Sequence, residues 1–279
     1  MKIPDSATEA WTDARSRSPL CHYGKWRLQW YEYWDEIATQ CREGELRPRG
    51  LEREIVRYLM QQQLLVPGDH VLDVGCGAGT FTLPFAATAS GVTGVDPSGA
   101  MLSRLQSAAG NAGLDNIRPI RTTWEDYCPE EPHDLVFSAF CPGIYDRHTL
   151  AKMEQASSRS CCYVAGDVSH FQLLGELWAA ITGECYTAEA WDIAHPVNYL
   201  RNTSRNPRVR CFRSRSLQRA ASGDVVEEFA AYFRSFIDLR HSEYKKIRHY
   251  IEARSKGGRI LLGKERTTWA VSWDVPAQL

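Results

Sequence analysis

The sequence predicts an α/β protein built on a doubly wound, mainly parallel β-sheet. Between residues 71 and 168, short apolar runs alternate with stretches of helical periodicity, a rhythm that indicates strand–helix–strand units. The first apolar run ends in a glycine-rich turn at residues 75–79 that opens a helix. Its 279 residues, 43% of them hydrophobic and 24% charged, are enough for one large domain with insertions or for two small domains.

The pattern of apolar residues and turn signals gives the expected elements in order. We expect strands at residues 71–74, 91–95, 117–121, 134–140, 160–168, 209–217, 259–262 and 267–275. We expect helices at residues 26–39, 50–65, from about 80, 99–109, 147–157, 171–182, 223–238 and 242–255.

Local signals justify these elements one by one. Aromatic residues recur at helical spacing in 26–39, and we expect one face of the next helix to carry Leu51, Ile55, Leu59 and Met60. A Val-Pro-Gly turn precedes the first strand, and a glycine and asparagine run from Gly110 ends the helix that begins near Gly99. Residues 183–207 show no clear period, and the last two strands form an antiparallel edge.

Composition excludes several classes of protein. No apolar run reaches the about 18 residues of a membrane span, and the amino-terminal residues are polar and mixed in charge, unlike a secretory signal. The nine cysteines are scattered without a C-x-x-C pair, which favours a reduced, cytoplasmic protein over a disulfide framework or zinc site. We expect no metal, since no cluster of His, Asp and Glu has ligand spacing. A net charge of −1 argues against nucleic-acid binding over the whole surface, and the oligomeric state stays open.

The glycine turn is the most informative motif. Gly75, Gly77 and Gly79 are spaced G-x-G-x-G with Asp73 two residues before them, whereas the dinucleotide fingerprint G-x-G-x-x-G requires a glycine where Thr80 stands. An NAD-dependent oxidoreductase is therefore disfavoured. Asp96 ends the next strand 23 residues after Asp73, near the offset of about 20 residues that ribose-binding acids show.

These motifs resemble those of class I S-adenosylmethionine (SAM)-dependent methyltransferases. Residues 71–80 resemble motif I of the family and residues 94–101 resemble motif II; residues 123–126 and 134–140 match the end of its third strand and its fourth strand. The resemblance covers residues 33–168 and, more loosely, the strand at 267–275. It implies a seven-stranded sheet whose last strand is antiparallel.

The resemblance also implies which residues hold the cofactor. The glycines would bring backbone amides against the methionine tail and ribose, Asp73 would meet the amino group, and Asp96 would accept the ribose hydroxyls. Met101 would form one wall around the adenine. The complete expected set is Tyr33, Trp34, Asp73, Gly75, Cys76, Gly77, Gly79, Thr80, Asp96, Pro97, Met101, Trp124, Glu125, Asp126, Ser138 and Ala139.

The acceptor side is predicted from the residues after the fourth strand. Phe140, Cys141 and the more distant Trp191 are expected to bind the acceptor. Tyr145, His148 and His195 are candidates for proton transfer, with His170 a further histidine candidate, although a histidine is more often a satisfied or solvent-facing residue. The sequence Cys-Pro-Gly at 141–143 departs from the N-P-P-Y pattern of methyltransferases that act on nucleobase amines, which weakens that reading.

A cluster of arginines occupies residues 201–219 without an acid among them. It could grip phosphates of a nucleic acid or carboxylates of a small substrate. A structural role as a charged edge strand is the third reading. The members are Arg201, Arg205, Arg208, Arg210, Arg213, Arg215 and Arg219.

We therefore expect residues 1–50 to form a helical lid and residues 51–279 a methyltransferase domain, with acceptor-side insertions at about 170–207 and 222–256. The predicted function is in-line methyl transfer from SAM to a small-molecule acceptor. The arginines could bind carboxylates of that acceptor, in which case it would be anionic. An RNA methyltransferase that uses residues 201–219 is the first alternative. A SAM-binding partner subunit without catalysis of its own is the second.

Overall fold

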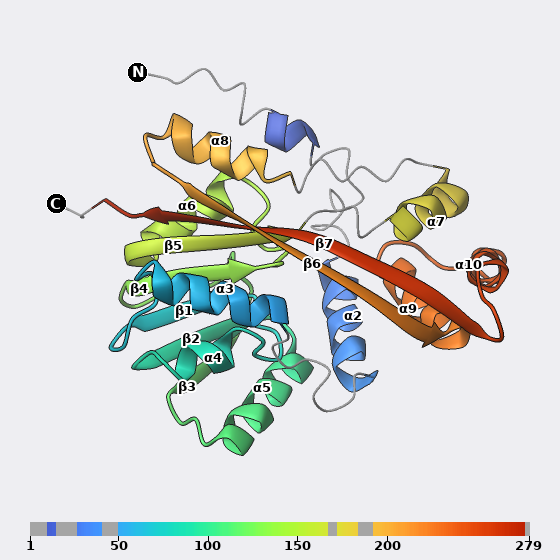
Figure 1. The fold of residues 1–279 in the computed structure, drawn as a ribbon, viewed down its shortest axis with the longest axis horizontal. Coiled ribbons are helices and arrows are strands. Elements are labelled where there is room, and N and C mark those ends of the chain that lie inside the picture. The colour runs from blue at the N-terminus through green and yellow to red at the C-terminus, as the bar shows by residue number, and fades with distance from the viewer. Residues whose placement is uncertain (1–9, 15–26, 41–49, 167–171, 184–191, 277–279) are drawn as a thin grey trace.

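The computed structural model describes residues 10–14, 27–40, 50–166, 172–183 and 192–276. Within these residues seven strands form one sheet in the order β3-β2-β1-β4-β5-β7-β6 (Figure 1). Strands β1 to β5 are parallel to one another, and β7 is antiparallel to both β5 and β6. The predicted seven-stranded α/β sheet with an antiparallel last strand is confirmed.

The elements have the following bounds. The strands are β1 (His70–Val74), β2 (Gly91–Asp96), β3 (Ile117–Arg121), β4 (His133–Ala139), β5 (Ser157–Gly166), β6 (Arg208–Ala221) and β7 (Arg259–Asp274). The described helices are α2 (Arg27–Gln40), α3 (Gly50–Gln61), α4 (Thr82–Ala86), α5 (Gly99–Ala112), α6 (Arg147–Gln155), α7 (Gln172–Thr182), α8 (Ala194–Asn202), α9 (Ser222–Arg234) and α10 (His241–Ala253).

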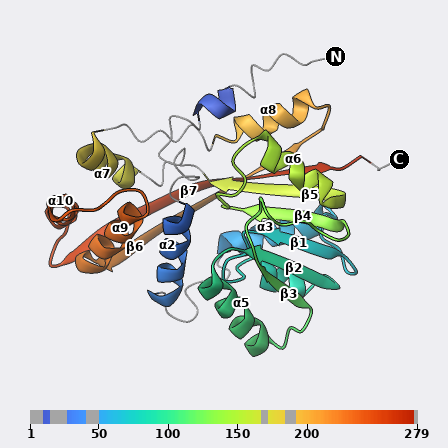
Figure 2. The same cartoon turned by 180° about the vertical axis from the view of Figure 1, so that it is seen from behind.

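Helices cover both faces of the sheet because successive strand residues point to opposite faces. Along β4, Leu135 and Phe137 join the core formed with α3 and α4. The residue between them, Val136, faces the core that contains Leu150 of α6 and Val197 of α8. The two views in Figures 1 and 2 show these helix layers on either side of the sheet.

Some expected boundaries differ from the structure. The second predicted helix ends at Gln61 rather than near residue 65, because the chain turns and the amides of Leu64 and Leu65 both bond to the carbonyl of Leu59. Gly110 does not end α5; the helix continues to Ala112, and Gly113 supplies the left-handed cap with φ of 66°.

Two larger differences concern the carboxyl-terminal half. Helix α8 lies in a segment for which the sequence showed no period. The two strands expected at 259–262 and 267–275 are one continuous strand, β7, which lies between β5 and β6 instead of at the edge. The edge strand on this side of the sheet is β6, because among the described strands it pairs with β7 alone.

The strands β6 and β7 extend beyond the parallel part of the sheet. Residues 268–274 of β7 pair with β5, whereas residues 259–267 pair only with β6. This two-stranded ribbon therefore passes the carboxyl end of β5 at Gly166, as Figure 1 shows. Together with α7, α9 and α10 it forms what we call the C-terminal lobe, whose core includes Leu177, Phe233, Ile247 and Ile260.

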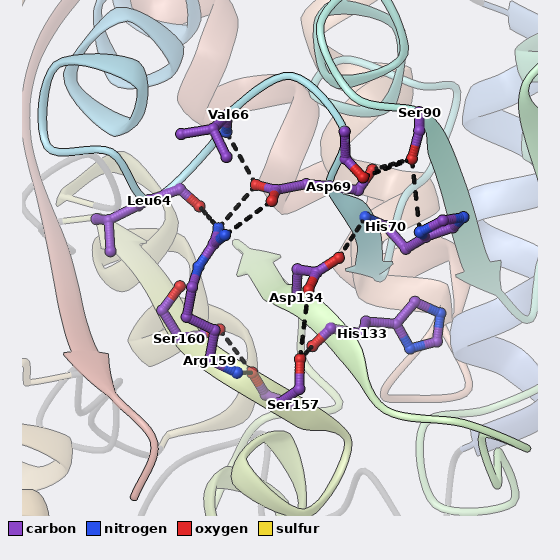
Figure 3. Close-up of polar contacts among 12 residues, drawn as sticks. Leu64, Val66, Asp69, His70, Ser90, His133, Asp134, Ser157, Arg159 and Ser160 are labelled. Carbon is purple, nitrogen blue, oxygen red and sulfur yellow. Dashed lines mark hydrogen bonds and ion pairs between the residues drawn. The ribbon is translucent and has the colours of Figure 1, made fainter. Parts of the chain in front are cut away.

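The amino ends of the parallel strands are held by a polar network (Figure 3). Arg159 in β5 donates two hydrogen bonds to the carboxylate of Asp69, at 2.8 and 2.7 Å, and one to the carbonyl of Leu64 at 3.0 Å. Asp134 in β4 accepts from the amide of His70 at 2.8 Å. The polar side chains at the amino ends of the strands thus hold the sheet together. Parallel sheets bind ligands at the carboxyl ends of their strands, so a ligand site is expected there.

Within the part of the chain that the structure describes, no helix is both long and apolar enough to cross a membrane.

Candidate cofactor and acceptor site

The glycine turn after β1 uses its three glycines for two different reasons. All three have positive φ: 74° at Gly75, 52° at Gly77 and 91° at Gly79. A Cβ on Gly75 would lie 2.5 Å from the Sγ of Cys141, and one on Gly79 would lie 2.5 Å from Leu105. A Cβ on Gly77 would meet nothing within 4 Å. The outer glycines are thus required by packing, whereas Gly77 faces open space.

Two carboxylates flank this turn, the buried Asp73 and the partly buried Asp96. Asp73 in β1 is 2% exposed and accepts a hydrogen bond of 2.6 Å from the hydroxyl of Thr82. Burial, with a smaller contribution from the negative charge of Asp96, raises the pKa of Asp73 to about 7 even though the bond from Thr82 lowers it. Asp96, at the end of β2, accepts 2.9 Å bonds from the amides of Gly77 and Ser98. Burial likewise raises the pKa of Asp96.

The amino end of α5 lies beside the turn. Ser98 caps this helix by accepting a bond of 3.1 Å from the amide of Met101. Met101 is buried in a small cluster with Ala78 of the turn, and Trp34 of α2 packs against it. The aromatic helix that the sequence placed near the cofactor is therefore in contact with the predicted adenine wall. The carbonyl of Pro97 accepts from Arg121 at 3.3 Å.

The three residues after β3 have different surroundings. The buried Trp124 donates its indole N–H to the carbonyl of Thr149 at 2.9 Å. The exposed Asp126 accepts from the Thr123 hydroxyl at 2.7 Å. The Oε2 atom of Glu125 is buried and has no hydrogen-bond partner among the described residues. A buried acceptor without a partner is rare, which makes Glu125 the better suited of the two acids to receive a ligand N–H.

The turn after β4 holds one residue in a strained conformation. Phe140 has φ of 52°, is 45% exposed, and lies against Gly166 at the end of β5. Left-handed conformations of bulky residues cost energy and cluster at functional sites. Ser138, just before it, is buried and donates to the carbonyl of Val74 at 3.1 Å. Burial raises the pKa of Cys141 to about 12, so its thiol is neutral near pH 7.

The remaining predicted residues lie around this region or on the helices that cover the sheet. Tyr145 packs against the core of the C-terminal lobe. His148 is exposed on α6 and accepts from Arg147 at 3.2 Å. His195, on α8, stacks on Trp11 with centroids 6.0 Å apart. Trp191 and His170 lie outside the described residues.

Sequence reasoning missed three residues of this region. Thr82 binds Asp73, Tyr232 of α9 packs on Tyr33 at 5.9 Å, and Asp35 binds Ser98. Asp35 adjoins the aromatic pair Tyr33-Trp34, so its position on the predicted aromatic helix was the signal that could have identified it as a residue of this region. Tyr232 carried no local signal, because its contact depends on how distant elements pack.

Part of the sequence is similar to known methyltransferases. Residues 71–173 match the sequence model of a family described as a methyltransferase domain. The 23S rRNA (uracil(1939)-C(5))-methyltransferase RlmD of Alkalilimnicola ehrlichii is 45% identical over 69 residues, which are 23% of this chain and 16% of that protein. An uncharacterized protein of Haemophilus influenzae is 30% identical over 107 residues, 38% of this chain and 39% of that protein. The chain thus spans well under half the length of these relatives.

Solved structures share the fold at low identity. A putative methyltransferase from Bacillus halodurans has a TM-score of 0.54 at 12% identity, covering 80% of this chain and 99% of its own. A SAM-dependent methyltransferase from Thiobacillus denitrificans, in complex with S-adenosyl-L-homocysteine (SAH), has a TM-score of 0.52 at 12% identity, covering 84% and 94%.

A glycine turn after the first strand and an acid after the second mark a nucleoside-binding α/β domain. The family match is more specific than this general class: residues 71–173 match a methyltransferase domain, and the solved structures of methyltransferases share the fold.

Replacing Gly77 with alanine tests whether the open space beside it receives a ligand. We expect Gly77→Ala to fold but to lose SAH binding in a calorimetric titration, because the new methyl group would enter that space. Gly113→Ala is the matched control, since Gly113 is also left-handed and also has nothing within 4 Å of a built Cβ. Both variants should lose a similar stability of about 1–2 kcal/mol. Equal SAH affinity in the two variants would contradict the assignment.

The buried carboxyl of Asp73 predicts a pH-dependent difference in stability. Its pKa rises from 3.8 to about 7 on folding, so between these values the folded state holds a proton that the unfolded state has lost. Stability from this group is therefore lost as pH rises through that window. The neutral variant Asp73→Asn should gain thermal stability over the wild type, and the gain should be larger at about pH 8 than at about pH 5. A pH-independent difference in melting temperature would contradict the shift.

Proposed function

We propose that this chain transfers a methyl group from SAM to a small-molecule acceptor that lies between the carboxyl ends of β4 and β5 and the C-terminal lobe. The observation that carries the proposal is that the C-terminal lobe lies beyond the carboxyl ends of these strands and covers the region next to them. The ring of Tyr232 meets Tyr33 edge-on at 5.9 Å. Tyr145, in the loop after β4, packs on the lobe's core. A site covered by the chain itself suits a small acceptor better than a polymer.

The residues around the turn fit the cofactor on two structural observations. The open position at Gly77 leaves room for a ligand beside Asp96, and the buried oxygen of Glu125 has no partner among the described residues. We assign Asp96 to the ribose hydroxyls, Glu125 to the adenine amino group and Asp73 to the amino group of the methionine tail. The backbone of the glycine turn would contact the tail, and Met101 with Trp34 would flank the adenine.

The protein's part in the chemistry is alignment and exclusion of water. Bound SAM supplies a methyl group on a sulfonium, which is already a good leaving group. Phe140 offers an exposed aromatic face at the end of β4, which can hold a cationic or aromatic group. Cys141 stays a neutral thiol and therefore forms a wall rather than acting as a base. Proton transfer by Tyr145, His148 or His195 remains a prediction, needed only for an acceptor that must lose a proton.

The contacts of the arginine segment support a structural role. Arg205 makes two 2.9 Å bonds to Glu154, which also accepts from the indole of Trp273 at 2.8 Å. Arg208 pairs with Asp274 at 2.9 and 3.0 Å. Arg208 and Arg210 lie in the edge strand β6 where β7 separates it from β5, three strand spacings from β4, or roughly 14 Å. These features favour a small-molecule acceptor over RNA.

The acceptor class is tested by following a labelled methyl group. Purified protein is incubated with methyl-labelled SAM and with either the metabolite fraction or the RNA fraction of a cell extract. We expect label in the metabolite fraction, no label with Gly77→Ala, and unchanged transfer by the double variant Arg210→Ala/Arg213→Ala. Label in RNA that this double variant abolishes would contradict the proposal. SAH binding without transfer to either fraction would instead favour the partner-subunit alternative.

A further inference from the structure

Asp35, on α2, lies outside the glycine turn and the other motifs of the sequence, yet it contacts the amino end of α5 beside Asp96. Its Oδ1 atom accepts a hydrogen bond of 2.5 Å from the hydroxyl of Ser98 and one of 3.2 Å from the amide of Ala100. Ser98 is 1% exposed and is the N-cap residue of α5. A carboxylate at this position is stabilised by the amino end of a 14-residue helix.

These bonds continue without a break to the glycine turn. The hydroxyl of Ser98, held by Asp35, accepts from the amide of Met101, while the amide of Ser98 donates to Asp96 at 2.9 Å. The other oxygen of Asp96 accepts from the amide of Gly77 at 2.9 Å. The position of Asp96 is therefore coupled to a side chain on α2 through one shared partner, Ser98.

The same helix also meets the acceptor side. Its Trp34 packs on Ala78 and Met101, and its Tyr33 packs on Tyr232 of the C-terminal lobe. Figures 1 and 2 both show α2 between α5 and the lobe. Because Asp35 accepts the two hydrogen bonds that join α2 to the amino end of α5, loss of these bonds would loosen one wall of the cofactor site without removing any group that touches the ligand.

We propose that Asp35 is a positioning residue that fixes α2 on the amino end of α5 and thereby orients Asp96 and the segment 97–101 for the cofactor. This inference rests on the proposed function. Asp35 acts through Ser98 and Ala100 and does not itself contact the ligand. A charged acceptor suits the role, because hydrogen bonds to a carboxylate are stronger than those to a neutral group.

The ionisation of Asp96 gives a readout that a merely structural residue would leave unchanged. The titratable groups that face Asp96 are Asp35 from α2, Asp73 from β1, Cys76 from the turn and Cys141 after β4. Burial is the largest cause that raises the pKa of Asp96, and the negative charge of Asp35 adds to it. Removing that charge should lower the pKa of Asp96, so its carboxylate would persist to lower pH.

The test is a calorimetric titration with SAH across the range from about pH 5 to about pH 8. Asp35→Ala should bind SAH about tenfold more weakly than the wild type, because ligand binding must then supply part of the free energy that the two lost bonds from Ser98 and Ala100 provided to order residues 97–101. Asp35→Asn should keep most of the affinity, and its loss of affinity at acid pH should occur at a lower pH than in the wild type. Glu32→Ala, an exposed site on the same helix, is the control and should match the wild type.

Each result decides between the alternatives. Wild-type affinity in Asp35→Ala, or an equal loss in Glu32→Ala, would overturn the positioning role while leaving the proposed function intact. If Asp35→Ala does not fold, the pH at which Asp35→Asn loses its affinity for SAH decides. The same pH as in the wild type would overturn the inference. A folded wild type that does not bind SAH would overturn the cofactor assignment itself, and the inference with it.

Discussion

The close approach of backbone at the glycine turn is the constraint on which the site depends. Gly75 and Cys76 both donate their amides to the carbonyl of Val95, at 2.8 and 3.1 Å, which brings the ends of β1 and β2 together. Gly75 also lies so close to Cys141 that no side chain fits there. Residues distant in the sequence, Asp73, Asp96 and Phe140, are thereby gathered at one edge of the sheet.

The amino ends and the carboxyl ends of the parallel strands therefore have different roles. At the amino ends, side-chain bonds from Arg159 and Asp134 hold the strands, and their acceptors are satisfied within the protein. At the carboxyl ends, Glu125 keeps an unpartnered buried oxygen among the described residues, and Phe140 keeps a strained backbone. A folded protein tolerates such features where binding energy from a ligand compensates for them. The C-terminal lobe extends beyond the carboxyl ends.

Local patterns in the sequence were sufficient for the parallel strands, the glycine turn and the acid at the end of β2. They were insufficient where register and long-range packing decide. The continuous strand β7 and its place inside the sheet follow from its pairing with both β5 and β6, which periodicity does not encode. For the same reason the sequence could not show that Glu125 and Asp126 differ in their surroundings, or that Asp35 reaches Ser98 across 63 positions of the chain.

The central claim is that the turn and the acid after β2 form the site of a SAM-dependent methyltransferase. Calorimetric titration of the wild type and of Asp96→Ala with SAH tests it most directly. We expect saturable binding by the wild type and at least tenfold weaker binding by Asp96→Ala, since the ribose hydroxyls would lose a charged acceptor. A folded wild type that does not bind SAH, or a variant that binds it as tightly as the wild type, would contradict the account.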